Sequence, residues 1–238
     1  MLPPWLLAHA RQPLAALVDH TLLRPETTED DIARLCDEAV ALGFGAVCVN
    51  GQWVGRAAAR LRGRRTGVVA VVGFPLGACG LVAKAAETRL VVADGATEVD
   101  VVLSLGSARG GQWDEVRDEL LAVVDAARGR PVKVILETAA LEPRQVELAA
   151  RVAIEAGARM LKTSTGFHPA GGATLEQVAL LRRVAGTEVG VKASGGIRTA
   201  ADAVAMLRAG ADRIGASGAA GWTGVVGPEA PRLESLLG

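Results

Sequence analysis

The sequence predicts a closed (β/α)8 TIM barrel with an extra N-terminal helix, and two observations predict it. Four times, a helical pattern ends in glycine and leads into a short apolar run, at Gly43, Gly95, Gly157 and Gly210. Glycine just past the last turn is the usual left-handed stop of a helix, so a β-rich run after it indicates a strand. Each of the three intervals between these glycines has room for two βα units, and counting the strands along the whole chain gives eight strands and eight helices in 238 residues.

The expected strands are short runs that are apolar almost throughout. This pattern suits a parallel sheet, whose strands are buried on both faces. In chain order the runs are LVDHT (17–21), AVCVN (46–50), TGVVAVVGF (66–74), ATEVDVV (96–102), PVKVILET (131–138), ARMLKTS (158–164), EVGVKAS (188–194) and ADRIGAS (211–217).

Helical segments alternate with these strands, and two carry clear capping signals. The segment 27–42 begins with threonine and an acidic first turn, and the segment 142–157 has proline at its start. A doubly wound open sheet is the competing architecture, and a Gly-x-Gly-x-x-Gly fingerprint after the first strand would favour it. The segment GFGAVC precedes its strand and lacks the third glycine, so no nicotinamide site is indicated.

Length and composition favour a single domain over residues 1–238 that acts on a small molecule. Half of the residues are hydrophobic, and Lys plus Arg balances Asp plus Glu at 26 each, which gives no reason to expect nucleic acid or a membrane as partner. The three cysteines form a poor disulfide framework, so a reducing cytoplasm is expected. The first residues lack the features of a signal peptide, and no apolar run reaches the ~18 residues of a spanning helix.

Lysine is rare in this chain, with four lysines among the 26 basic residues. Lys133, Lys162 and Lys192 lie inside apolar strand segments, whereas Lys84, in the helical segment LVAKAAETRL, sits where a surface lysine normally would. Arginine would have served at the three strand positions if a permanent charge were all that was needed. The choice of lysine therefore indicates amines that can lose a proton.

The three strand lysines come from neighbouring strands, and Asp100 comes from the strand beside them. Active groups of a TIM barrel project from the C-terminal ends of its strands, so these side chains should share one cavity. Burial and the repulsion of like charges both favour a neutral amine, which can attack a carbonyl and form an imine. Asp100 could relay protons or keep a second lysine charged. Lys162, which hydroxyls and a glycine follow directly, is the best nucleophile candidate, and Lys192 is nearly as good.

Glycine loops after the last two strands predict a phosphate site. Gly195 and Gly196 follow the seventh strand, and Gly215, Ser217 and Gly218 accompany the end of the eighth. Backbone N–H groups at such loops bind phosphate, so a phosphorylated substrate is expected. The three histidines are scattered, with neither a His-x-x-x-His motif nor a cysteine pair, so neither a metal nor a cofactor is expected.

Two other functions stay open on the residues alone. A phosphosugar isomerase or epimerase could use the same barrel with acid–base catalysis and no imine. A non-catalytic barrel that binds a phosphorylated ligand is the other alternative, and it leaves the three strand lysines unexplained.

The residues singled out above lie in motifs that closely resemble the deoxyribose-phosphate aldolase family. From about residue 15 to 220 the motifs occur in order, as DHTLLRP, VCVN, VVGFPLG, EVDVVLSLG, VKVILET, LKTSTGF, GVKASGGIRT and RIGAS. The resemblance implies a metal-independent class I aldolase. Such an enzyme reversibly cleaves 2-deoxy-D-ribose 5-phosphate to D-glyceraldehyde 3-phosphate and acetaldehyde through a Schiff base. A homo-oligomer, dimer or tetramer, is expected with it.

The resemblance also assigns roles to residues. It implies that Lys162 is the Schiff-base lysine, that Asp100 and Lys192 form the proton-relay pair, and that Asp19 and Thr21 support the relay. Lys133 joins the candidate catalytic residues. The residues expected to bind substrate or phosphate are Thr163, Gly166, Gly195, Gly196, Ser217, Gly218 and Cys48. Many members have Ser-Ser where this chain has Ser217-Gly218, and some use a tyrosine in proton transfer, whereas this chain contains none.

Overall fold

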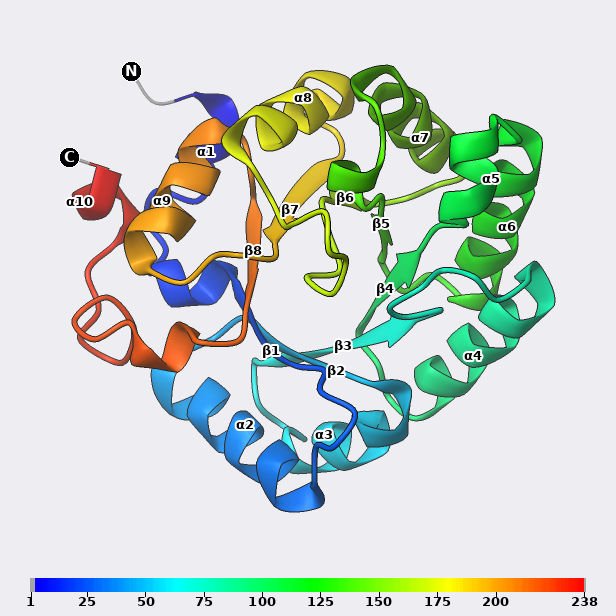
Figure 1. Ribbon diagram of the computed structural model, residues 1–238. Coiled ribbons are helices and arrows are strands. Elements are labelled where there is room, and N and C mark those ends of the chain that lie inside the picture. The colour runs from blue at the N-terminus through cyan, green and yellow to red at the C-terminus, as the bar shows by residue number, and fades with distance from the viewer. Residues whose placement is uncertain (1–2, 238) are drawn as a thin grey trace.

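The computed structural model, which describes residues 3–237, contains the closed parallel barrel that the sequence predicts. The eight strands pair in chain order and β8 closes onto β1 (Figure 1). The strands are β1 (Val18–Leu22), β2 (Ala46–Val49), β3 (Gly67–Val72), β4 (Glu98–Val102), β5 (Val132–Ile135), β6 (Met160–Lys162), β7 (Gly190–Ser194) and β8 (Arg213–Ala216).

Helices surround the barrel, and their pattern differs from the predicted one at three places. The helices are α1 (Pro4–Leu7), α2 (Glu29–Leu42), α3 (Val54–Arg60), α4 (Leu81–Ala93), α5 (Leu105–Gly110), α6 (Trp113–Ala126), α7 (Pro143–Glu155), α8 (Leu175–Ala185), α9 (Ala200–Ala209) and α10 (Leu233–Leu237). The expected N-terminal helix is a single turn, two helices follow β4, and only the short η4 turn (Ala219–Gly221) directly follows β8. None of the helices over residues 3–237 has the length and apolarity needed to span a membrane.

Capping boxes mark the starts of α2, α7, α8 and α9, and the sequence indicated the first two, by threonine with an acidic turn before α2 and by proline at the start of α7. Thr28 precedes α2 and exchanges hydrogen bonds with Asp31, and Thr174 and Thr199 form the same capping box before α8 and α9. Gly43 ends α2 in the left-handed conformation, with a φ of 77°. These local signals fix where α2 begins and where the chain turns into β2.

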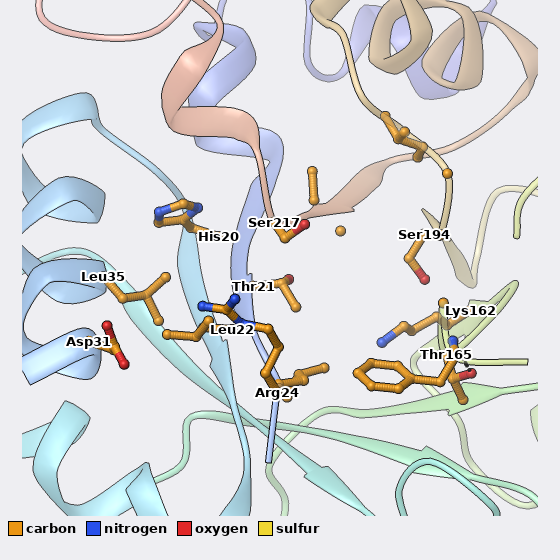
Figure 2. A pocket seen from close by; sticks show the side chains of 18 of the residues that line it. His20, Thr21, Leu22, Arg24, Asp31, Leu35, Lys162, Thr165, Ser194 and Ser217 are labelled. Atoms are coloured by element: carbon orange, nitrogen blue, oxygen red, sulfur yellow. Dashed lines mark hydrogen bonds between the residues drawn. The ribbon is translucent and has the colours of Figure 1, made fainter. Parts of the chain in front are cut away.

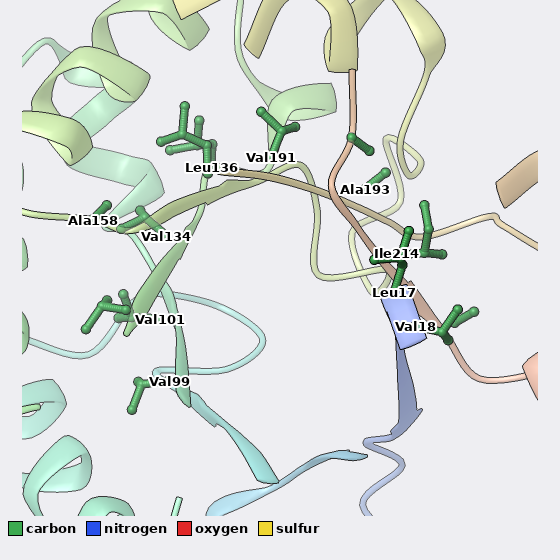
Figure 3. Close-up of a cluster of buried hydrophobic side chains, with 14 of the residues drawn as sticks. Leu17, Val18, Val99, Val101, Val134, Leu136, Ala158, Val191, Ala193 and Ile214 are labelled. Carbon is green, nitrogen blue, oxygen red and sulfur yellow. The ribbon is translucent and has the colours of Figure 1, made fainter. Parts of the chain in front are cut away.

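Two environments arise from the alternation of side chains along each strand. Outward-facing residues pack against the helices, and Figure 3 shows part of this layer, with Val99 and Val101 of β4, Val134 of β5 and Val191 of β7. Inward-facing residues on the β2 and β3 side are small and apolar: Ala46, Cys48, Val69 and Val71. The inward-facing residues of β4 to β8 include most of the charged groups of the barrel, so one half of the interior is apolar and the other is ionic.

Lys84 is not the surface lysine that its helix suggested. Its side chain is 0% exposed, between α4, α6 and the end of β4. The amine donates to the Val102 carbonyl oxygen at 2.8 Å and pairs with Glu119 of α6 at 2.7 Å. A carboxylate oxygen of Glu119 also accepts from the Ser104 N–H at 3.0 Å. This buried ion pair therefore fixes the C-terminal end of β4.

Candidate active site

A cavity of about 510 Å³ opens at the C-terminal ends of the strands, and Lys162 is the one strand lysine that lines it. Figure 2 shows Lys162 on one side, with Thr21, Arg24 and Ser217 between it and helix α2. Six residues from the predicted site form part of the wall: Thr21, Lys162, Gly166, Gly195, Gly196 and Ser217. The lysine amine therefore faces a space that is large enough for a small sugar phosphate.

Asp100 joins the three strand lysines inside the barrel. One of its oxygens accepts from the Lys133 amine at 2.8 Å, and the other accepts from Lys162 at 2.9 Å and from Lys192 at 2.8 Å. Lys192 also donates to Asp19 on β1. Lys133, Lys192, Asp19 and Asp100 are all buried beneath the cavity, so the predicted cluster exists, with Lys162 as its outermost member.

The carboxylates reverse the effect that burial alone would have on two of these amines. Burial lowers the pKa of Lys192, but Asp100 and Asp19 outweigh it and raise that pKa above its ordinary value. Burial also lowers the pKa of Lys133, but the charge of Asp100 outweighs it, so the pKa of Lys133 lies above its ordinary value. Burial would raise the pKa of Asp100, yet the three lysines hold it well below its usual range. Burial and the repulsion of like charges therefore do not decide the charge of Lys133 and Lys192, because carboxylates contact both amines directly.

Two further charged residues lie in this cluster, and the sequence reasoning did not single them out. Glu98 of β4 pairs with Lys133 at 2.6 Å and with Arg213 of β8 at 3.2 Å. Arg213 in turn donates to Asp19 at 2.7 Å. Both residues begin their strands, at the end of the barrel opposite the cavity. The only sequence signal for them is a pair of charges at the start of otherwise apolar runs.

Thr163 and Cys48, two of the residues expected to bind substrate or phosphate, are not among the residues that line the cavity. The Thr163 hydroxyl donates to the Ser194 carbonyl oxygen at 3.2 Å and accepts from the Ser194 N–H at 3.1 Å, which ties β6 to β7. Cys48 is buried in the apolar half of the interior, and burial raises the pKa of its thiol. Both residues stay close to the cluster without lining the cavity.

The loop after β6 is held in place above Lys162 by Glu137, which the sequence reasoning left without a role. Glu137 adopts a left-handed backbone conformation with a φ of 52°. Its carboxylate accepts from the Thr165 hydroxyl at 2.5 Å and from the Thr165 N–H at 3.2 Å. The ring of Phe167, two residues on, meets that of Phe74 edge to face at 5.2 Å. These contacts link the loops after β3, β5 and β6 around the mouth of the cavity.

The predicted phosphate loops come together backbone to backbone. Gly166 and Gly195 have φ values of 83° and 85°, and a Cβ on Gly195 would lie 2.9 Å from the Gly172 Cα and 3.2 Å from the Gly166 Cα. Only glycine suits this contact. At the start of α9, Asp202 accepts from the N–H of Arg198 at 3.1 Å and of Thr199 at 2.9 Å, so these two N–H groups are already paired.

Two arginines of the first βα unit also line the cavity, and the sequence reasoning missed both. Arg34 of α2 pairs with Asp31, so its charge is already matched. The side chain of Arg24 is 65% exposed and reaches Glu26 only at 3.8 Å. His20, on the same wall, pairs with Glu38 at 2.8 Å. Arg24 is thus a weakly paired cation beside the phosphate loops.

Known proteins share both the sequence and the fold of this chain. Residues 14–224 match the model of the DeoC/LacD family aldolases. A deoxyribose-phosphate aldolase of Brevibacillus brevis is 50% identical over 200 residues, which cover 84% of this chain and 90% of the relative. Another, deoxyribose-phosphate aldolase 2 of Bacillus licheniformis, is 49% identical over 205 residues, covering 86% and 92%.

A solved structure agrees with the sequence relatives. The deoxyribose phosphate aldolase from Aeropyrum pernix, described as having a unique tetrameric structure, superposes with a TM-score of 0.81 at 37% identity, and the match covers 87% of each chain. The barrel, the lysine cluster and these matches agree with one another, and the chain belongs to the DeoC/LacD family of aldolases.

Proposed function

We propose that this protein is a class I aldolase that reversibly cleaves 2-deoxy-D-ribose 5-phosphate to D-glyceraldehyde 3-phosphate and acetaldehyde. One observation carries the proposal: the Lys162 amine lines the cavity, while two further amines are fixed on carboxylates beneath it. Relatives that are about half identical over most of this chain carry the name of this activity.

Lys162 is the nucleophile in this scheme, rather than Lys192. Lys192 is 0% exposed and contacts two carboxylates, both of which raise its pKa and keep it charged. Lys162 contacts Asp100 alone among the carboxylates of residues 3–237 and faces the cavity. An amine needs a free electron pair to attack a carbonyl carbon, and Lys162 is the strand lysine that combines access with the fewest opposite charges.

The reaction begins when the Lys162 nitrogen adds to the aldehyde carbon of the open-chain sugar phosphate. The carbinolamine takes up a proton and loses water, which leaves an iminium group. Asp100 and Lys192 supply and accept the protons, because one oxygen of Asp100 contacts both amines. Asp19 and Lys133 hold this pair in place through their own contacts with Lys192 and Asp100.

The iminium group then serves as the electron sink for carbon–carbon cleavage. Removal of the C3 hydroxyl proton breaks the C2–C3 bond, and its electrons move into the iminium group to form an enamine. Glyceraldehyde 3-phosphate leaves at this step. Protonation of the enamine at C2 and addition of water then release acetaldehyde and restore the Lys162 amine.

The phosphate lies in the cradle of the glycine loops in this scheme. The backbone of Gly166, Gly195 and Gly196 and the segment Ser217–Gly218 supply neutral N–H donors. Arg24 supplies a positive charge, because it lines the same cavity and its own carboxylate partner is distant. We further propose that the protein acts in the cytoplasm as a homo-oligomer, dimer or tetramer, in the breakdown of deoxynucleosides.

Borohydride trapping tests the proposal directly. The protein is treated with EDTA, incubated with deoxyribose 5-phosphate and reduced, and the modified peptide is identified by mass spectrometry. We expect one adduct, on Lys162, and none on the equally buried Lys84, which lies outside the barrel interior. An adduct on Lys192 would overturn the assignment. A Lys162→Arg variant that retained activity would instead support the isomerase or epimerase alternative, because that chemistry needs no imine.

A further inference from the structure

Six charged side chains form a closed ring inside the barrel, and their signs alternate. Asp100 contacts Lys133, Lys133 contacts Glu98, Glu98 contacts Arg213, Arg213 contacts Asp19, Asp19 contacts Lys192, and Lys192 contacts Asp100 again. A longer contact of 4.0 Å joins Lys133 to Asp19 across the ring. Three carboxylates thus balance three cations, and the ring is neutral by itself.

Lys162 is attached to this ring from outside, through its 2.9 Å contact with Asp100. Its proton adds a positive charge, and among residues 3–237 Asp100 is the one carboxylate within 4.0 Å of this amine. Of the strands that give no member to the ring, β2 carries the Cys48 thiol, whose raised pKa keeps it neutral, and β3 (GVVAVV) carries no titratable group. At the mouth of the cavity Glu137 accepts from Thr165, and Asp31 with Arg34 and Glu38 with His20 pair with each other, which leaves Arg24 as the weakly paired charge. The net charge of the ring should therefore affect how readily the Lys162 amine loses its proton.

We infer that Glu98 and Arg213, at the end of the barrel opposite the cavity, are positioning residues that set how readily Lys162 loses its proton. Neither residue lines the cavity, so neither touches the substrate. They act through charge: Glu98 favours a protonated Lys162, and Arg213 opposes it. This inference rests on the proposed function, in which the neutral Lys162 amine is the reactive form.

Two substitutions by glutamine, each of which removes one charge and keeps a polar side chain, test the inference with opposite signs. Glu98→Gln leaves the ring with one excess positive charge, and Arg213→Gln leaves it with one excess negative charge. Imine formation with acetaldehyde is trapped by cyanoborohydride over a range of pH, and the midpoint of the labelling profile is measured. We expect Glu98→Gln to lower the midpoint by about one pH unit and Arg213→Gln to raise it by a similar amount, a tenfold change each in reactive amine at a given pH.

The double variant separates charge from structural damage. Glu98→Gln with Arg213→Gln restores a neutral ring, so its midpoint should return toward that of the unchanged protein. A purely structural role would instead make the double variant the worst of the three. Circular dichroism checks that each variant is folded. If Glu98→Gln fails to fold, Glu98→Met replaces it in the series and should also lower the midpoint, because it removes the same negative charge.

The outcomes distinguish this inference from the proposed function. If the unchanged protein gives no adduct on Lys162, the proposed function fails. If the unchanged protein is labelled on Lys162 but the single variants shift the midpoint in the same direction, or not at all, the inference about Glu98 and Arg213 fails and the proposed function stands.

Discussion

Replacing Asp100 by asparagine tests the centre of the site, because the change removes one charge and keeps the shape of the side chain. Asp100 is fully buried and accepts from three amines at 2.8 to 2.9 Å. The amide can accept with one oxygen only, and its NH2 group faces amines that are donors themselves. At least one lysine of the cluster therefore loses its contact with residue 100, and Lys162 has no second carboxylate partner among residues 3–237.

The expected losses differ for turnover and for stability. A positioned acid–base group contributes roughly 10²- to 10⁴-fold to the rate, so kcat for deoxyribose 5-phosphate cleavage should fall by that factor. Removing one member of a buried charge cluster costs about 3–5 kcal/mol. At about 2–4 °C per kcal/mol for a chain of this length, the Tm should fall by roughly 6–20 °C.

Two measurements on the same variant decide whether Asp100 acts as proposed. Steady-state kinetics gives kcat, and borohydride trapping with acetaldehyde separately measures imine formation at Lys162. Because Lys162 is unchanged, the folded variant should still be labelled at that residue while turnover is lost. A kcat within tenfold of the unchanged protein would refute the acid–base role, and loss of labelling in a folded variant would show that Asp100 is needed for the nucleophile itself.

Three further outcomes are expected. Glu119→Gln should lower the free energy of unfolding by about 3–5 kcal/mol in urea titrations, because it leaves the buried Lys84 amine without its carboxylate, whereas Lys84→Met with Glu119→Leu should recover much of that loss. Stability should hold between about pH 5 and pH 10 and fall outside that range. The buried aspartates have lowered pKa values, so their contribution is lost as pH falls below about 4. The Lys133 and Lys192 amines have raised pKa values, so theirs is lost above about pH 10.4. A free energy of unfolding that is the same at pH 3 and pH 7 would contradict this. Arg24→Met should raise KM for the phosphorylated sugar about tenfold with kcat little changed, and should leave cleavage of unphosphorylated deoxyribose unaffected. Equal effects on both substrates would mean that Arg24 does not contact the phosphate.

The barrel and the central cluster could be predicted from sequence because each depends on a local pattern. Glycine stops and apolar runs locate the strands, and three rare lysines and an aspartate inside those runs identify the interior. The order of parallel strands then brings Asp100, Lys133, Lys162 and Lys192 together without further information.

The remaining features depend on contacts between distant segments. The sequence predicts a surface position for Lys84 because its partner lies far along the chain. Glu119, on another helix, supplies the negative charge that stabilises the buried amine. Glu98 and Arg213 begin their strands, where charges are ordinarily exposed, and only the closed barrel joins them. The raised pKa values of Lys133 and Lys192 follow from short distances to carboxylates. The sequence shows how many charged residues the strands carry, but it does not give these distances.

The three-glycine contact between the loops after β6 and β7 has a consequence for how the substrate is captured. Gly166, Gly172 and Gly195 touch through their backbones, so the two loops are fixed to each other and neither can swing away alone. Their conformational entropy is therefore lost during folding, before any ligand arrives, so the proposed phosphate site spends little binding energy on ordering these two loops. If phosphate binds there, we expect its association to be governed by diffusion and charge rather than by movement of these loops.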